Sequence, residues 1–516
     1  MNLSSQPFFV FFALLIFSFF IGSCDYGSNS SDDEVNLSAA SDTLGHLPFT
    51  LSFVEKTWDS PVQLPRLQSY AYAMEDSGEL LVIGGRRQGL HTFKSEGENF
   101  IRDSSNNFIF VIDFDSGDQW KFDVNQLKGE LSAPLQATNQ QFHYDRESGT
   151  LYLVGGYGWK ADKSNMKTFS TMIWVDVEDL IQAVKNGSSP DEVQKLFSWF
   201  QDERMAVTGG ELLKKDNAFY LIMGQVFHGQ YRAFGGEDFT QKYTEEIKVF
   251  TLNPNTPGIL SYGATTNTEQ DRPFHRRDLN IIEDVDPASG EERIAVLGGV
   301  FPPGIIGAYT YPIYIKGPQD YTLDRNVNQK FSQYECPVIS VYDSNADSAA
   351  VYHTFFGGIS HYYYFQTDSQ KLIYDLATEQ GRNDGLPFNG DITTLQLNAD
   401  GSSSQFIFPT PIPGNRLLGT STHFIPHPEI FGSGVAMDNG VIDLSEIESG
   451  KKVLIGYIYG GIEAEAPLPK VPNTGTFVSN SVFEVYISRE IYEVISASQA
   501  KESTKDISGL DYLRGR

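Results

Sequence analysis

The sequence predicts an all-β protein built from six repeated units. Two observations predict this class: hydrophobic runs that end in glycine recur along the chain, and strand-like segments precede and follow them across short turns. Helical periodicity is nearly absent, and 177–200 is the one stretch that predicts a pair of helical segments.

Each unit begins with a hairpin whose second strand ends in glycine. The second strands are LLVIGG (Gly84, Gly85), LYLVGG (Gly155, Gly156), FYLIMGQ (Gly224), IAVLGG (Gly298, Gly299), YHTFFGG (Gly357, Gly358) and IGYIYGG (Gly460, Gly461). The third run is degenerate, because it keeps one glycine. A further strand follows in each unit: NNFIFVIDF, STMIWVDV, EEIKVFTL, YTYPIYI, DITTLQL and SVFEVYI.

These units resemble the kelch repeat of the galactose oxidase/kelch-like superfamily over about residues 48–490. The distal aromatic residues of that repeat are mostly missing, and Trp120 is the best match. The resemblance implies a six-bladed β-propeller. The segment 229–250 also resembles uncharacterised Bacteroidetes kelch-repeat lipoproteins.

The two ends of the repeat array predict how the propeller closes. The last unit runs out after SVFEVYISRE without a convincing fourth strand, whereas LPFTLSFVEKTW (47–58) precedes the first unit as an orphan strand. We expect this N-terminal strand to be the outer strand of the last blade, because that placement removes an exposed sheet edge. The expected propeller spans 47–490, and 491–516 form a C-terminal tail.

The first 46 residues predict export and anchoring. An uncharged apolar stretch, 7–22, is short for a membrane span but suits a signal peptide, which we assign to 1–23. Its end, Ile21-Gly22-Ser23-Cys24, resembles a bacterial lipobox, which implies cleavage before a lipidated Cys24. Residues 24–46, acidic and Ser-rich, then form a tether. The resemblance implies the bacterial cell envelope, on the outer membrane or cell surface; the alternative is an ordinary secretory signal.

Composition excludes several classes of protein. A formal net charge of −28 argues against a nucleic-acid partner, and 13% aromatic residues argue against disorder. Two cysteines cannot form a disulfide framework.

Propeller geometry predicts where a ligand would bind. Residues before each first strand and after each glycine pair should line one funnel mouth. The candidate ligand-binding residues there are Arg66, Arg86, Arg87, Trp159, Arg204, Arg276, Arg277 and His361. Arginine suits a carboxylate or phosphate. The alternative is that these arginines form salt bridges with nearby acids such as Asp202, Asp278 and Glu335.

No familiar catalytic motif or cofactor signature occurs, and we expect neither metal nor cofactor. A copper site of the galactose oxidase kind needs a cysteine cross-linked to tyrosine, and Cys336 looks like a buried strand residue. Two hypotheses remain: a module that binds a glycan or an envelope protein, or an enzyme on an anionic sugar, by analogy with the kelch-type mutarotase. Glu335 and His423 are the acid/base candidates for the second.

Overall fold

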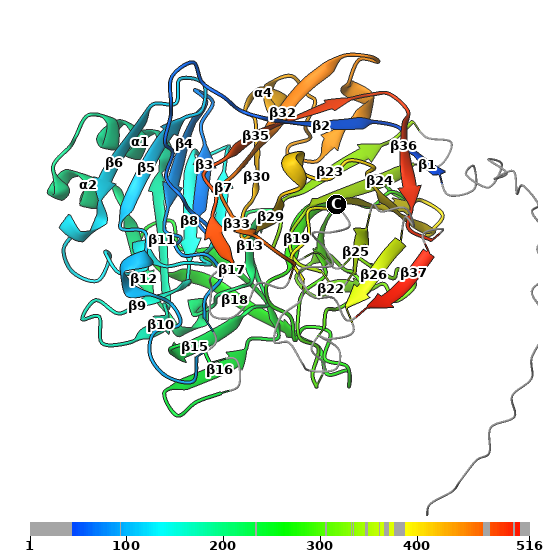
Figure 1. The fold of residues 1–516 in the computed structure, drawn as a ribbon. Coiled ribbons are helices and arrows are strands. Elements are labelled where there is room, and N and C mark those ends of the chain that lie inside the picture. The colour runs from blue at the N-terminus through cyan, green and yellow to red at the C-terminus, as the bar shows by residue number, and fades with distance from the viewer. Residues whose placement is uncertain are drawn as a thin grey trace, which may run out of the picture. The chain divides into compact units, whose positions relative to one another are not determined.

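A computed structural model describes most of the chain (Figure 1). The residues outside the description are 1–43, 93, 233–234, 305–306, 332, 334, 346–348, 361, 366–370, 376–386, 468–474, 499–500 and 506–516. The prediction of an all-β fold is confirmed, because strands grouped in small sheets make up most of the described structure. The signal peptide, Cys24 and most of the tether lie outside the described residues.

The first four units each form one antiparallel four-stranded sheet in chain order. The first is β3 (Ala71–Met74), β4 (Glu79–Ile83), β5 (Phe108–Asp113) and β6 (Gln119–Asp123). The second is β7 (Gln141–Asp145), β8 (Thr150–Val154), β11 (Thr171–Asp176) and β12 (Ser198–Gln201). The third is β13 (Glu211–Lys215), β14 (Ala218–Ile222), β17 (Glu246–Leu252) and β18 (Ile259–Thr266). The fourth is β19 (Asn280–Val285), β20 (Glu292–Leu297), β21 (Ile313–Gly317) and β22 (Asp320–Leu323).

The fifth unit has a larger sheet than the sequence predicts. Its four strands are β23 (Val338–Asp343), β24 (Ala350–Phe356), β27 (Ile392–Asn398) and β28 (Ser403–Ile407). Beyond β28 the sheet continues with β36 (Tyr492–Ser496) and β1 (Leu44–Leu47), and β31 (Ile442–Asp443) joins its other edge. β36 therefore lies beyond residue 490, where we expected the propeller to end.

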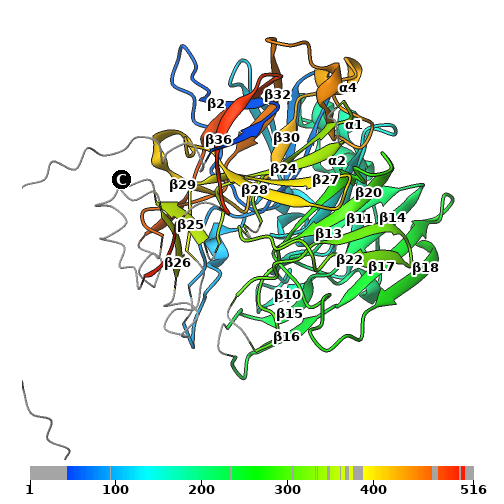
Figure 2. The same cartoon turned by 90° about the vertical axis from the view of Figure 1, so that its right-hand side faces the viewer.

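The sixth unit contains the N-terminal strand. Its sheet has the order β2, β35, β32, β30, with β30 (Phe424–Pro426), β32 (Lys452–Tyr459), β35 (Val482–Ser488) and β2 (Thr50–Glu55). β2 pairs with β35 in antiparallel register from Thr50 opposite Ser488 to Glu55 opposite Phe483. In Figures 1 and 2 the blue β2 lies among the orange and red C-terminal strands.

Glycines at the ends of five second strands join their unit to the next. The N–H of the second glycine donates to a carbonyl of the following unit: Gly85 to Ala137, Gly156 to Val207, Gly224 to Arg276, Gly358 to Leu418 and Gly461 to Leu67. The last of these bonds links the sixth unit to the first. In the second unit the first glycine leaves no room for a side chain, because a Cβ on Gly155 would lie 2.0 Å from the Val207 carbonyl oxygen.

The third run is degenerate in sequence but keeps the backbone shape. Met223 occupies the place of the first glycine with φ 55°, and Gly224 follows with φ 84°. The left-handed conformation is thus retained where the expected Gly-Gly is absent.

Connections after the glycine pairs build smaller sheets and a layer over one face of the units. One sheet has the order β16 (Phe239–Tyr243), β15 (Gln225–Gly229), β10 (Met166–Thr168), β9 (Tyr157–Trp159). The second contains β29 (Leu417–Thr420), β33 (Ile462–Ala464) and β34 (Thr476–Val478), and the third contains β25 (Tyr362–Phe365), β26 (Lys371–Asp375) and β37 (Lys501–Lys505). The first of these sheets packs around Tyr157, Phe227, Tyr231 and Phe239. Its strands β15 and β16 are labelled in Figures 1 and 2.

The α-helices are few. α1 (Val177–Lys185) and α2 (Pro190–Leu196) form the pair predicted over 177–200, and α4 (Glu429–Gly432) lies in the long connection of the sixth unit. α1 buries Leu180, Ile181 and Val184 against the first and second sheets. The capping box of α2, between Ser189 and Glu192, explains why that helix begins where it does.

Candidate functional site: a central cavity lined by all six units

One cavity of about 1000 Å³ is lined by the first strand of every unit. Its walls come from β3, β7, β13, β19, β23 and β30, which gather toward the middle of Figure 1. A cavity of this volume has the size of a small-molecule or glycan site. We call it the central cavity.

Six residues just before these first strands form what we call the axial ring. Each has a positive φ: Ser69, Asn139, Gly209, Asp278, Glu335 and Ser421. Backbone N–H groups donate around the ring from Asn139 to Ser69, from Ser69 to Ser421, from Ser421 to Glu335 and from Asp278 to Gly209, at 2.7–3.2 Å. Backbones hydrogen-bonded to one another leave little space between them, so the axial ring narrows this end of the central cavity.

The other end of the cavity is formed by hairpin turns. Glu147, Asp216, Asn217 and Glu292 line it there and are exposed. The cavity therefore has an exposed turn end and a more enclosed ring end.

Glu335 is the most constrained carboxyl group at the ring end. Its Oε1 accepts a hydrogen bond from the Asn139 side-chain amide at 3.0 Å, and its Oε2 accepts one from the Ser421 hydroxyl at 3.2 Å. Burial raises the pKa of Glu335 well above its usual value, and the neighbouring Asp278 raises it further. Burial thus disfavours the charged form of this carboxyl group.

Two further glutamates on the cavity wall have raised pKa values. Burial raises the pKa of Glu211 to about 8, although its carboxylate accepts a hydrogen bond from the Leu212 N–H. Burial, with the charge of Glu292, raises the pKa of Glu283 to about 8. Both side chains are half-buried because they border the cavity, yet lie deep enough for desolvation to dominate.

Asp278 differs from these glutamates because it has a cationic partner. Its Oδ2 lies 3.3 Å from Nε of Arg277, which opposes the increase in the pKa of Asp278 that burial causes. Arg277 is buried on the far side of the axial ring from the central cavity, among Phe227, Tyr231 and Phe301.

Aromatic rings form one wall of the cavity. The imidazole of His423 lies 5.2–5.9 Å from the rings of Tyr70, Tyr72 and Phe142, measured between centroids. Burial lowers the pKa of His423 to about 4, so its imidazole is neutral at pH 7. Of the sequence candidates for acid/base chemistry, both Glu335 and His423 therefore line the central cavity.

The basic residues that line the cavity lie toward the turn end and are engaged. Lys214 is ion-paired with Asp145, and Lys215 donates to the Glu292 carbonyl at 3.4 Å. The guanidinium of Arg146 lies 4.2 Å from the ring centre of Phe431 and forms an ion pair with Asp76 at 3.4 Å.

No family model matches this chain, and no curated protein matches it. Among solved structures, the chain is similar to one titled "Structure of YjhT", with a TM-score of 0.41 and 12% sequence identity. That similarity covers 83% of this chain and 99% of the other. At this TM-score it carries no inference about function.

Three of the arginines expected at a funnel mouth are buried outside the central cavity. Arg276 is 0% exposed, lies 4.2 Å from the Tyr309 ring centre and donates to the carbonyls of Pro273, Gly298 and Tyr311. Arg86 is 2% exposed and donates to the Gln88 side chain and the Ile101 carbonyl. Arg86, Arg276 and Arg277 thus connect the segments that follow the glycine pairs. Their hydrogen bonds to carbonyl groups and their packing on aromatic rings account for a structural role.

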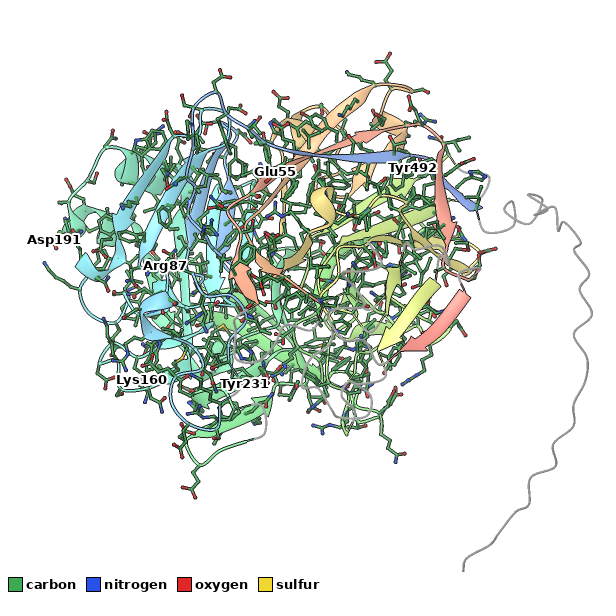
Figure 3. The ribbon with its side chains drawn as sticks, in the orientation of Figure 1. Glu55, Arg87, Lys160, Asp191, Tyr231 and Tyr492 are labelled. Atoms are coloured by element: carbon green, nitrogen blue, oxygen red, sulfur yellow. The ribbon has the colours of Figure 1, made fainter. Side chains whose placement is uncertain are left out.

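The other arginine candidates are engaged on the surface. Arg66 donates to the Val478 carbonyl at 3.1 Å, and Arg87, labelled in Figure 3, donates to the Asp103 carbonyl at 2.7 Å. Arg204 forms a fork with both carboxylate oxygens of Asp202, which is the salt bridge that we considered as the alternative. Trp159 lies under the guanidinium of Arg102 at 4.5 Å. His361 lies outside the described residues. The described lining of the central cavity includes none of these candidates.

Sequence reasoning missed Glu211 and Glu283 as cavity residues. The available signal was their position: Glu211 is the first residue of a first strand, and Glu283 is the fourth of another. Inward positions along first strands, rather than the residues before them, would have identified both.

Two further searches of the described residues were negative. No group of three or more His, Cys, Asp or Glu side chains there is arranged to hold a metal ion. In the same residues, no helix has the length and apolar character needed to cross a membrane. Cys336 is buried, and burial raises the pKa of its thiol to about 12.

Proposed function

We propose that this protein is a lipid-anchored, kelch-like β-propeller of the bacterial cell envelope that binds a glycan in its central cavity. In this proposal the main sheets of the six units are six blades, and β2 closes the ring in the last of them. The chain of glycine-pair hydrogen bonds, including the one from Gly461 to Leu67, supports that arrangement. Lipidation of Cys24, followed by the acidic tether, would hold the propeller at the membrane.

The observation that carries the proposal is the composition of the cavity wall. Aromatic faces at Tyr72 and Phe142 stand beside carboxyl and amide groups at Glu335, Asn139 and Gln141. The apolar face of a sugar ring packs on an aromatic ring, and its hydroxyls hydrogen-bond to carboxyl and amide oxygens. The proposal places the ligand here rather than at the candidate arginines, because the guanidiniums of those six residues are already bound to carbonyls or carboxylates.

A glycan array probed with the full-length protein in detergent would identify ligands, and calorimetry would measure them. Phe142→Ala should weaken binding at least tenfold, since the side chain lines the cavity and loses a stacking face. The matched control is Phe477→Ala on β34, which removes an aromatic ring 40% exposed outside the cavity lining. Absence of any glycan ligand, or equal effects of the two substitutions, would refute the proposal.

A second candidate function is catalysis on a sugar, with Glu335 as the acid. The observation that favours it is a carboxyl group with a raised pKa, held by Asn139 and Ser421, on the wall of a sugar-sized cavity. The mutarotase-like alternative predicts faster exchange between anomers of a bound sugar, which NMR would detect. Loss of that exchange in Glu335→Gln, with binding retained, would support catalysis; exchange at the uncatalysed rate in the wild type would exclude it.

A further inference from the structure

The ring end of the central cavity has a surplus of hydrogen-bond acceptors. Glu211, Asp278, Glu283 and Glu335 line the cavity, and among the described residues only Asp278 forms an ion pair. Gln141 also lines it and is 2% exposed. Its side-chain oxygen has no hydrogen-bond partner among the described residues. Buried acceptors without donors are costly, so this end favours a ligand that supplies donors.

Lys215 opposes the rise in the pKa of Glu283, and Arg277 opposes that of Glu335, but both cations are already bound to other groups. Arg146, Lys214 and Lys215 lie toward the turn end and are bound to other groups. Arg277 is bound to Asp278, the Gln225 amide oxygen and the Tyr231 hydroxyl. His143 and His423 contribute no charge, because burial lowers the pKa of each to about 4.

We infer that the central cavity selects a saccharide with a free primary amine, whose ammonium group contacts Glu335 and Glu211 at the ring end. This inference rests on the proposed glycan-binding function and names the ligand class. The ammonium group brings three donors and a positive charge to a site that has acceptors and no free cation among the described residues. The aromatic wall at Tyr72 and Phe142 remains available for the sugar ring.

The same wall discriminates against two related ligands. An anionic sugar would place its carboxylate beside Glu211 and Glu335, and the described cations near them are already bound to other groups. An N-acetylated sugar keeps the ring but replaces the ammonium group with a neutral amide. Binding energy that depends on charge is therefore lost on acetylation, whereas stacking on the aromatic wall is retained.

The test uses oligosaccharides of glucosamine, N-acetylglucosamine and glucuronic acid, titrated into the full-length protein by calorimetry. We expect the glucosamine oligomer to bind at least tenfold more tightly than its N-acetylated counterpart, and the glucuronic acid oligomer to bind weakest. Glu335→Gln and Glu211→Gln should each reduce the preference for the free amine, while leaving affinity for the N-acetylated oligomer within about threefold. Glu178→Gln, an exposed change on α1 outside the cavity lining, is the matched control and should leave the preference intact.

The outcomes separate this inference from the function on which it rests. Equal affinity for the free and N-acetylated oligomers, or a preference for glucuronic acid, would overturn the amine inference while leaving glycan binding in place. Binding of none of the three, together with an empty glycan array, would overturn both. Retained amine preference in both Gln variants would also overturn the inference, with unchanged melting temperatures showing that the variants are folded.

Discussion

Asn139 and Glu335 are 196 positions apart, yet the Asn139 side-chain amide donates to the Glu335 carboxyl at 3.0 Å. They belong to the second and fifth units, and both have left-handed backbones in the axial ring. Their hydrogen bond ties units that are not neighbours in the chain.

Replacing Asn139 with Ala should destabilise the fold, because Glu335 would lose a donor in a buried place. We expect a loss of about 1–3 kcal/mol in the free energy of unfolding, measured by denaturant titration. The control is Asn125→Ala, which removes an exposed amide whose nearest acceptor is Asp123. If both variants are equally stable, the hydrogen bond has no energetic role.

Glu211→Gln should stabilise the protein in alkaline solution. In the folded protein the pKa of Glu211 is raised to about 8, above its value in the unfolded chain. Its contribution to stability is therefore fully present at acid pH and is lost as the pH rises through about 8. The Gln variant avoids this loss. Melting curves should show a higher melting temperature for the variant at pH 9 and a small difference near pH 4.5; an increase confined to acid pH would contradict the assignment.

Gly155→Ala should strongly destabilise the junction between the second and third units. The new Cβ would lie 2.0 Å from the Val207 carbonyl oxygen, on a residue with φ 66°. Gly78→Ala is the control, because φ there is 85° with nothing within 4 Å. The control isolates the cost of the left-handed backbone, about 1 kcal/mol, and Gly155→Ala should exceed it by at least 2 kcal/mol in denaturant titrations. Equal losses would mean that the close approach is unimportant.

Removal of the N-terminal strands should expose two sheet edges. Deleting 24–43 leaves β1 and β2 and should leave the melting temperature nearly unchanged. Deleting 24–58 removes both strands and uncovers β35 and β36, so melting should fall by more than 10 °C. Deleting 24–49 separates the contribution of β1. Similar melting of the first two variants would refute closure by β2.

Cys24→Ser should release the protein from the membrane fraction and abolish labelling with an alkyne fatty acid. The physical reason is that two or more acyl chains are needed for stable anchoring. Cys336→Ser is the control, since that thiol is buried in the fold and should not accept lipid. A Cys24→Ser protein that stays with the membrane would exclude the lipobox interpretation.

The hairpins and the glycine pairs could be predicted because both are local signals. A hydrophobic run followed by Gly-Gly indicates a repeated structural unit when it recurs with the same flanking strands. The extension of the fifth sheet by β36 and β1 could not be predicted, because it depends on which edge remains open after the other strands pair. The sequence correctly predicted that Arg276 and Arg277 lie just before the first strand of the fourth unit. Local sequence does not determine, however, in which direction their side chains point. Tyr309, Tyr311 and Tyr231, which surround them, come from insertions whose positions the repeat does not determine.

The pairing of β2 with β35 has a consequence for the order of events during synthesis. Thr50 and Ser488 are opposite one another, so the sixth sheet cannot be complete until almost the whole chain has been made. Contacts of such sequence separation slow folding, and the apolar edge of β35 or β2 stays open in the meantime. If the chain is exported as we propose, it would cross the membrane before its two ends can pair, and this edge would first be covered in the envelope.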